Sequence, residues 1–305
     1  MVPDVTQIAR PALHLQRESL ELVLGDLPNE EREAQVESIL AAAGQNEATL
    51  QGLFCSLAGG CLVGAVFTEV QPGKTAAVWL PRVTPDAPPG TAHALIAAAC
   101  SWLESQDVAL AQTLLATVPE SDQNVLASAR FVHLAELLYL VASKDRLPNR
   151  QLGGTLQFVP AGSADHEQLA AIVEASYEGT CDCAGLDGVR RIQDVLSGYR
   201  AVGTSGADEW FFVRCGCDDV GCLILADHPR QGNLELVYMG VVPMWRGRGW
   251  GTEVAQWAEW RARVLGRDRL VLAVDAENGP ALAAYVAAGF RAWDRRSVYI
   301  RTFGL

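Results

Sequence analysis

The stretch LELVYMGVVPMWRGRGWG, residues 234–251, decides how the rest of the chain is interpreted. Residues 234–242 are apolar or β-branched almost throughout, which is typical of a strand buried on both faces. Pro243 cannot donate to a strand ladder and is expected to end the strand. Three glycines then alternate with larger residues before a helix expected over residues 252–265. The stretch therefore predicts a strand, a tight turn and a helix.

The glycine-rich turn has the features of an anion site. Its glycines, Gly247, Gly249 and Gly251, let the backbone turn sharply beside the unpaired first N–H groups of the helix. Arg246 and Arg248 add positive charge. The glycine spacing is neither that of a dinucleotide-binding fold nor that of a P-loop. We therefore expect a ligand that carries phosphates.

This turn resembles a known acetyl-CoA motif. Taken as Arg246-x-x-Gly249-x-Gly251, it is similar to the pyrophosphate motif of the GNAT acetyltransferase superfamily. The family's second signature is an Asn, an Ala, a Tyr and a Gly-Phe pair, and these residues follow an apolar strand at residues 269–274 as Asn278, Ala281, Tyr285, Gly289 and Phe290. Both signatures occur in the expected order, so the resemblance covers the C-terminal half.

The two halves of the chain share a register. An offset of 158 residues separates Val83 from Val241, Pro85 from Pro243 and Trp102 from Trp260. Such matches indicate either an internal duplication or a chance likeness between two α/β domains. The duplication predicts an α/β (α+β) chain of two tandem GNAT-like domains, similar in arrangement to mycothiol synthase. Each would have a mixed, mostly antiparallel sheet flanked by helices.

Three segments follow from this division. Residues 1–145 form a degenerate GNAT-like domain without acetyl-CoA, residues 146–154 a polar linker, and residues 155–305 the catalytic domain. The N-terminal half has Pro88 and Pro89 where the phosphate turn would lie, and proline lacks the N–H donor that a phosphate needs. Leu126 takes the place of Tyr285. We therefore expect one acetyl-CoA per chain.

Composition narrows the possible partners. The net charge of −12 disfavours nonspecific binding to nucleic acid or to an anionic membrane. The N-terminal segment lacks a basic start with an apolar core, and no apolar run approaches about 20 residues. We expect a cytoplasmic monomer or homodimer whose eight cysteines are thiols. The two C-x-C pairs, residues 181–183 and 215–217, are either a four-thiolate zinc site or small buried thiols, and we predict no metal.

Glu235 is the candidate general base. On a regular strand Glu235, Val237 and Met239 share one face, and Glu235 is the ionisable group there. Its position resembles that of the catalytic glutamate in several GNAT members, and burial in a cleft would raise its pKa toward the operating pH. The alternative is a glutamate at the exposed start of the strand. The same reasoning expects a bulge at Gly240 that opens the strand.

The resemblance assigns the remaining roles. Tyr285 matches the family's tyrosine that contacts or protonates the CoA sulfur, and we favour this role over the alternative of a residue that packs on the sheet with its hydroxyl at the surface. The acetyl-CoA contacts implied are Met239, Val241, Arg246, Gly247, Arg248, Gly249, Trp250, Gly251, Thr252 and Asn278. The loop between the first two helices lines the acceptor pocket in this fold. Here it carries Tyr177, Glu178 and Asp182, which would receive a cationic amine or simply be solvated.

The expected function is an acetyl-CoA-dependent N-acetyltransferase. An acetyl group would pass to a primary amine, on a small molecule or a peptide, by direct attack, with Glu235 as base and Tyr285 as acid. The alternative is a non-catalytic acyl-CoA-binding or regulatory module. Turnover of acetyl-CoA with any amine distinguishes the two.

Overall fold

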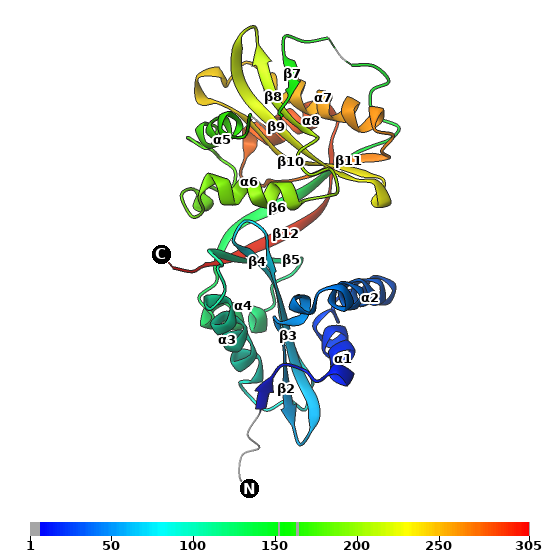
Figure 1. The fold of residues 1–305 in the computed structure, drawn as a ribbon, viewed down its shortest axis with the longest axis vertical. Coiled ribbons are helices and arrows are strands. Elements are labelled where there is room, and N and C mark those ends of the chain that lie inside the picture. Colours follow the sequence, from blue (N-terminus) through cyan, green and yellow to red (C-terminus); the bar gives the residue numbers. More distant parts are fainter. Residues whose placement is uncertain (1–6, 152, 163–164, 305) are drawn as a thin grey trace. The chain divides into compact units, whose positions relative to one another are not determined.

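The computed structural model describes residues 7–151, 153–162 and 165–304. The chain divides into two compact units. Unit 1 comprises Met1–His133 together with Val298–Leu305, and unit 2 comprises Leu134–Ser297. Each unit is a sheet with helices (Figure 1).

Unit 1 is built on the strand order β1-β2-β3-β4-β5-β12. Strands β1 to β4 pair antiparallel, and β4 pairs with β5 in parallel. Its elements are β1 (Gln7–Ala9), α1 (Leu13–Val23), α2 (Asn29–Gln45), β2 (Leu53–Ala58), β3 (Cys61–Gln71), β4 (Thr75–Val83), α3 (Thr91–Glu104), β5 (Leu110–Leu115), α4 (Glu120–Ser128) and the end of β12 (Arg291–Thr302).

Unit 2 repeats this plan with the order β7-β8-β9-β10-β11-β6. Its strands pair antiparallel except β10 and β11, which are parallel. Its elements are β6 (Val132–Ser143), β7 (Gln157–Pro160), α5 (His166–Ala175), α6 (Ile192–Ala201), β8 (Trp210–Cys215), β9 (Asp218–His228), β10 (Asn233–Val241), α7 (Trp250–Val264), β11 (Arg269–Asp275) and α8 (Gly279–Ala288). The predicted fold class, two tandem domains with mixed and mostly antiparallel sheets, is confirmed.

Alternation along the strands of unit 2 gives the sheet two apolar faces. One face packs against α7 and α8 through residues such as Leu225, Leu234 and Leu270. The other packs against α5 and α6 through Phe212 and Ile224. Because both faces are covered by helices, the central strands have the nearly continuous apolar character that the sequence shows.

The units do not follow the expected boundaries. Strand β6 was expected to close the N-terminal domain, but it pairs with β11 in unit 2. The end of β12 belongs instead to unit 1. Just after it, the Phe303 N–H donates a hydrogen bond to the Ala109 carbonyl at 3.0 Å. The expected linker, residues 146–154, lies inside unit 2, and Leu147 is buried in its core. Of the expected segments, residues 1–6 and Leu152 lie outside the described residues. Most of β6 thus lies in unit 2, and β12 passes from unit 2 into unit 1 at Val298, which sequence distance alone cannot reveal.

The bulge in β10 lies earlier than expected. The register between β10 and β9 shifts between Leu236 and Tyr238, so Val237 is the extra residue, not Gly240. The shift changes which side chains share a face. Val237 and Tyr238 both pack on the α5/α6 face, and Met239 packs with Leu236 on the α7/α8 face. The prediction that Met239 shares a face with Val237 is therefore wrong.

Candidate active site

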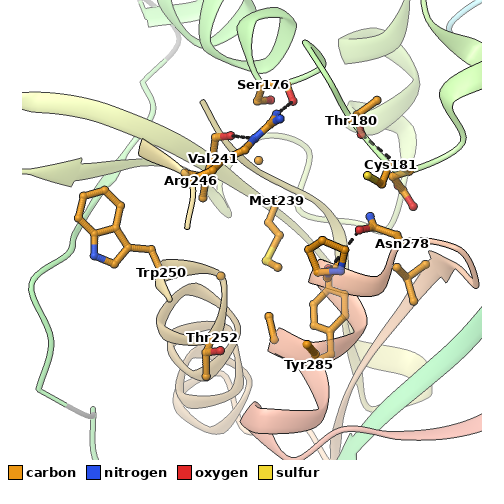
Figure 2. Close-up of a pocket in the computed structure, with 18 of the residues that line it drawn as sticks. Ser176, Thr180, Cys181, Met239, Val241, Arg246, Trp250, Thr252, Asn278 and Tyr285 are labelled. Atoms are coloured by element: carbon orange, nitrogen blue, oxygen red, sulfur yellow. Dashed lines mark hydrogen bonds between the residues drawn. The ribbon is translucent and has the colours of Figure 1, made fainter. Parts of the chain in front are cut away.

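The two parallel strands at the centre of unit 2 are paired over only part of their length. Their register joins Asn233–Glu235 to Arg269–Val271. Beyond these pairs lies a cavity of about 490 Å³, lined by residues from β10, β11, α7, α8 and the loop after α5. Figure 2 shows Arg246, Met239 and Tyr285 around this space. A cavity between diverging strands leaves one edge of β10 available to an extended ligand.

The cavity collects most of the residues that the sequence singled out. Twelve predicted site residues line it: Asp182, Met239, Val241, Arg246, Gly247, Arg248, Gly249, Trp250, Gly251, Thr252, Asn278 and Tyr285. Glu235, Tyr177 and Glu178 do not line it.

The glycine-rich turn has the geometry of a phosphate cradle. Gly247 and Gly249 both have a φ of 77°, a conformation that side chains disfavour. Helix α7 begins at Trp250, directly after Gly249. The first N–H groups of this helix have no partner within the helix, and they lie at the positive end of the helix dipole. This end of the cavity can therefore bind an anion through backbone N–H groups.

The two arginines of the turn do different things. Arg246 donates to three carbonyl oxygens, those of Val241 at 2.9 Å, Gly179 at 3.1 Å and Ser176 at 2.8 Å. It thereby ties the loop after α5 to the end of β10. The Arg248 guanidinium lies over the rings of Trp245 and Trp250, with its central carbon 4.6 Å and 5.4 Å from their centroids. Both arginines are exposed, and Arg248 differs from Arg246 in that it lies over aromatic rings while Arg246 binds backbone carbonyls.

Gly240 is required by a close approach and not by a bulge. A Cβ atom at this position would lie 2.3 Å from the Ser176 hydroxyl and 2.8 Å from the Tyr238 hydroxyl. Those two hydroxyls are themselves 2.7 Å apart. Ser176 and Tyr238 both line the cavity, and the sequence analysis did not identify them as site residues. Gly240 was the one sign of this contact in the sequence, but Ser176, which it approaches, lies 64 residues earlier in the chain.

Helix α8 supplies the other end of the cavity. The side-chain oxygen of Asn278 accepts a hydrogen bond from the Ala281 N–H at 3.2 Å and caps the helix. Tyr285 is 5% exposed, and its ring packs edge-on against Phe290 at 5.6 Å. Burial, with a smaller contribution from the charge of Asp182, raises the pKa of the Tyr285 hydroxyl. Tyr285 is therefore protonated at neutral pH and can donate a proton into the cavity.

The loop after α5 is held to the end of β11 by reciprocal hydrogen bonds. The Asp275 N–H donates to Asp182 Oδ1 at 3.0 Å, and the Cys183 N–H donates to Asp275 Oδ2 at 3.1 Å. Burial raises the pKa of the Asp182 carboxyl, and the hydrogen bond from the Asp275 N–H offsets part of that rise. Asp182 thus presents a carboxylate to the same cavity as Tyr285.

The other predicted residues lie outside the cavity. Glu235 Oε2 is 2.8 Å from His228 Nε2, and the Glu235 side chain is 36% exposed. The Tyr177 hydroxyl is 3.1 Å from that of Tyr199, and Tyr177 packs on the α5/α6 face. Tyr177 is therefore part of the core that supports the loop.

The paired cysteines do not form buried pairs. Cys181 and Cys217 are exposed, and Cys183 and Cys215 are half-buried. The expectation of buried thiols is wrong for these four residues because each pair lies at a loop or hairpin end. Within the described part of the chain, no group of three or more His, Cys, Asp or Glu side chains is arranged to hold a metal ion.

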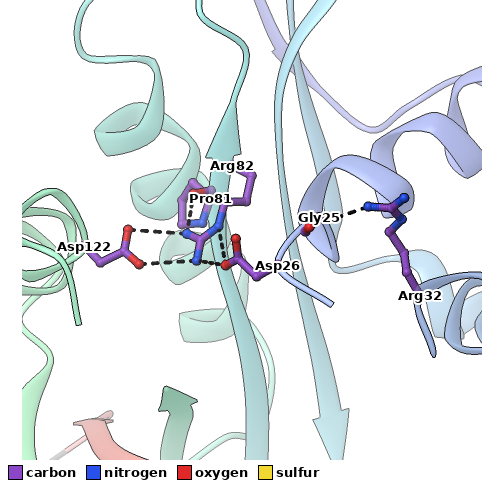
Figure 3. A network of polar contacts seen from close by, with 6 residues as sticks. All are labelled: Gly25, Asp26, Arg32, Pro81, Arg82 and Asp122. Atoms are coloured by element: carbon purple, nitrogen blue, oxygen red, sulfur yellow. Dashed lines mark hydrogen bonds and ion pairs between the residues drawn. The ribbon is translucent and has the colours of Figure 1, made fainter. Parts of the chain in front are cut away.

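The matching place in unit 1 is occupied by an ion-pair network. Arg82, 158 residues before Gly240, donates from Nε to Asp26 Oδ2 at 2.9 Å and from Nη1 to Asp122 Oδ1 at 3.3 Å. Figure 3 shows its guanidinium between the two carboxylates. Asp26 follows α1 and Asp122 lies in α4. The network therefore joins β4, α4 and the segment after α1, which are the unit 1 counterparts of β10, α8 and the loop after α5 in unit 2.

Comparisons with known proteins agree with the fold and with the turn. Residues 198–290 match the sequence model of the acetyltransferase (GNAT) family. No curated protein matches the chain. Among solved structures, a GCN5-related N-acetyltransferase from Sphaerobacter thermophilus is 16% identical with a TM-score of 0.67, over 99% of this chain and 97% of that one.

Two further solved structures are similar. A tandem GNAT protein from the clavulanic acid biosynthesis pathway is 14% identical with a TM-score of 0.52, over 98% of this chain and 99% of that one. A glucosamine N-acetyltransferase region in a fungal multi-domain GH3 β-N-acetylglucosaminidase is 14% identical with a TM-score of 0.65, over 98% of this chain and 38% of that one. At these identities the likeness establishes a fold, and the resemblance to mycothiol synthase stays a prediction.

A membrane-spanning helix must be long and continuously apolar. Within the described residues, no helix is both long and apolar enough to cross a bilayer.

Proposed function

We propose that this chain, whose residues 198–290 match the sequence model of the acetyltransferase (GNAT) family and whose fold is similar to that of a tandem GNAT protein, transfers an acetyl group from acetyl-CoA to a primary amine. Domains of the family bind acyl-CoA and transfer acyl groups, and the acetyl donor and the amine acceptor are our additions. The observation that carries the proposal is the cavity of unit 2. It is lined by the glycine-rich turn, which could hold an anion, and by the buried Tyr285 and the carboxylate residue Asp182.

The donor would lie along β10. The N–H groups of residues 247–252 would hold the pyrophosphate, with Arg248 adding positive charge. The pantetheine arm would pair with the backbone of Met239 and Val241 as an added strand, because β10 diverges from β11 there. The Met239 N–H would then polarise the thioester carbonyl. Asn278 would contact the cofactor near the start of α8.

The reaction needs a base and an acid. Tyr285 would protonate the departing thiolate, and its raised pKa keeps it in the protonated form needed for that step. Two carboxylates compete for the role of base. Glu235 is the sequence-based choice and would act through water, since it does not line the cavity, whereas Asp182 does line it.

Unit 1 would not bind acetyl-CoA. The Arg82 network already joins Asp26 to Asp122, and the two prolines, Pro88 and Pro89, remove N–H donors from the turn. This degenerate unit would instead support the fold.

The partners follow from charge and cysteine chemistry. A net charge of −12 favours a small-molecule or peptide amine over nucleic acid or an anionic membrane. All eight cysteines are free thiols, which fits a reducing compartment such as the cytoplasm. We expect a monomer or a homodimer.

Release of thiol from acetyl-CoA tests the proposal. Purified full-length protein is incubated with acetyl-CoA and each of four primary amines, glycinamide, tyramine, spermidine and glucosamine. The proposal expects amine-dependent thiol release with at least one of them. Tight acetyl-CoA binding without turnover for any amine would favour a non-catalytic acyl-CoA-binding module instead.

A further inference from the structure

Asp182 has a position that no other acidic residue shares. Among the described residues that line the cavity, it is the one with an acidic side chain. It faces the same space as Tyr285, and its charge contributes to the raised pKa of that tyrosine. A buried hydroxyl and a carboxylate that influence each other electrostatically therefore line the same cavity.

The position of Asp182 is fixed by backbone contacts. Its Oδ1 accepts the Asp275 N–H at 3.0 Å, and its own N–H donates to the Thr180 hydroxyl at 3.1 Å. Asp275 is 7% exposed, and both of its carboxylate oxygens accept backbone N–H groups, from Cys183 and Glu277. The Asp275 carboxylate is therefore used to hold the loop, and Asp182 is the residue of the two that lines the cavity.

Glu235 has the opposite environment. Its carboxylate is paired with His228 at the start of β10, and the side chain is 36% exposed. The β10–β11 pairing includes Glu235 itself, so the strands have not yet diverged at that point. A proton taken by Glu235 would have to travel around the paired strands, whereas Asp182 borders the space directly.

We propose that Asp182 is the carboxylate that binds the ammonium group of the acceptor and takes its proton. The inference rests on the proposed function. Asp182 accepts one proton from R–NH₃⁺, and the freed nitrogen attacks the thioester carbon. As the C–N bond forms and the C–S bond breaks, the Tyr285 hydroxyl protonates the sulfur. The second proton lost by the nitrogen returns to the tyrosinate through water, and Asp182 releases its proton to solvent.

This arrangement also selects the acceptor by charge. Asp182 at the cavity wall and Asp275 directly behind it present negative charge to an incoming group. A cationic primary amine would be attracted, and an anionic acceptor would be repelled. Acceptors should therefore be amines that carry no carboxylate next to the reacting nitrogen.

The assignment predicts a pH dependence of the activity. Burial holds the pKa of Asp182 above its usual range, which brings a carboxylate closer to the value that suits a general base. A base must be ionised to act, so activity falls as the pH drops through that pKa. The ionisable groups that surround Asp182 are Asp275 on β11, Tyr285 on α8, Tyr238 on β10, and Tyr177 and Cys183 next to its own loop.

The test compares three isosteric variants of the full chain: Asp182→Asn, Glu235→Gln and Asp187→Asn. The amine is whichever of the four probes the wild type acetylates. Asn at 182 keeps an oxygen for the Asp275 N–H, so the loop should stay in place. Asp187 lies on the same exposed loop outside the cavity and controls for loss of a loop charge. Acetyl-CoA affinity of each variant, measured by calorimetry, checks that the donor site is intact.

We expect Asp182→Asn to lower kcat/KM by about 10²–10⁴-fold while acetyl-CoA affinity is retained. Its residual rate should rise with pH in step with the fraction of unprotonated amine, because the variant cannot deprotonate the ammonium. Asp187→Asn should keep the wild-type rate. The inference is overturned if Asp182→Asn keeps the wild-type rate and pH profile, or if the acid limb disappears in Glu235→Gln and persists in Asp182→Asn. Wild-type protein that acetylates none of the probes would contradict the proposed function itself.

Discussion

Arg246 donates a hydrogen bond from Nε to the carbonyl oxygen of Val241 at 2.9 Å. The first residue of the phosphate motif is therefore bound to the last residue of the strand that precedes it. Its other nitrogens bind the carbonyls of Gly179 and Ser176, in the loop after α5. Arg246 joins the donor side of the cavity to the side where we place the acceptor.

Replacing Arg246 with alanine should loosen that loop. Arg246→Ala removes all three hydrogen bonds from the guanidinium to backbone carbonyls of β10 and the loop. We expect faster amide hydrogen exchange at residues 176–182. Arg248→Ala is the matched control, because Arg248 lies over two tryptophan rings. It should leave exchange unchanged and weaken acetyl-CoA binding more at low salt than at high salt. Equal exchange in both variants would refute the anchoring role.

Replacing Gly249 with aspartate should abolish tight acetyl-CoA binding. The change places a side chain at a φ of 77° and a negative charge where the pyrophosphate would lie. Gly266→Asp is the control, since Gly266 has a φ of 70°, open space for a Cβ atom and a position outside the cavity. Calorimetry should find binding retained in Gly266→Asp. Unchanged acetyl-CoA affinity in Gly249→Asp would show that the turn does not bind the pyrophosphate.

Replacing Tyr285 with phenylalanine should slow the chemical step alone. The ring keeps its packing against Phe290, so acetyl-CoA affinity should be retained while kcat falls by about 10²-fold or more. Tyr199→Phe removes a buried hydroxyl outside the cavity and should keep the wild-type kcat. A wild-type kcat for Tyr285→Phe would show that another group protonates the thiolate.

A buried glutamate in α7 should make the protein less stable as the pH rises. Glu259 is 3% exposed, its Oε1 has no hydrogen-bond partner, and burial raises its pKa to about 8. Between its unfolded pKa of about 4.3 and about 8, the unfolded state loses the proton while the folded state keeps it, so stability falls. Above about pH 8 the loss is complete.

Glu259→Gln should therefore be more stable than wild type by a few kcal/mol at pH 9, and by little at pH 4. Urea unfolding at both values measures the difference. Glu167→Gln, at an exposed position of α5, should show no pH-dependent gain. A gain for Glu259→Gln of equal size at both pH values would mean that ionisation is not its cause.

Each chain should bind one acetyl-CoA. In unit 1 the Arg82 side chain is only 24% exposed and is paired with Asp26 and Asp122, and the turn carries two prolines. Titration of the intact chain should saturate near one equivalent, and Gly249→Asp should leave close to none. Saturation near two equivalents would contradict the assignment of unit 1.

Local patterns predicted the parts of the site that are local in sequence. The strand, the turn and the start of α7 lie within residues 234–251, and the capping Asn278 with Tyr285 lies within one helix. Each depends on neighbouring residues, so spacing and glycine positions were enough. The mixed, mostly antiparallel character of the sheets also followed from the resemblance.

The parts that depend on distant partners could not be predicted. Both halves end in a strand, and nothing in the sequence of β6 or β12 tells which sheet each joins. The bulge at Val237 is set by pairing with β9, and it moved Met239 to the other face. The sequence could not distinguish Asp182 from the other two candidate residues of the loop, because its orientation depends on a hydrogen bond with Asp275, 93 residues later in the chain.

The central claim is that the cavity of unit 2 passes an acetyl group directly from acetyl-CoA to an amine. Mass spectrometry of the products formed from acetyl-CoA labelled in its acetyl group measures this most directly. The account predicts a labelled amide of one probe amine, formed by the wild type and lost in Gly249→Asp. Label that stays in acetyl-CoA, or that appears only as acetate, while the protein binds acetyl-CoA would contradict it.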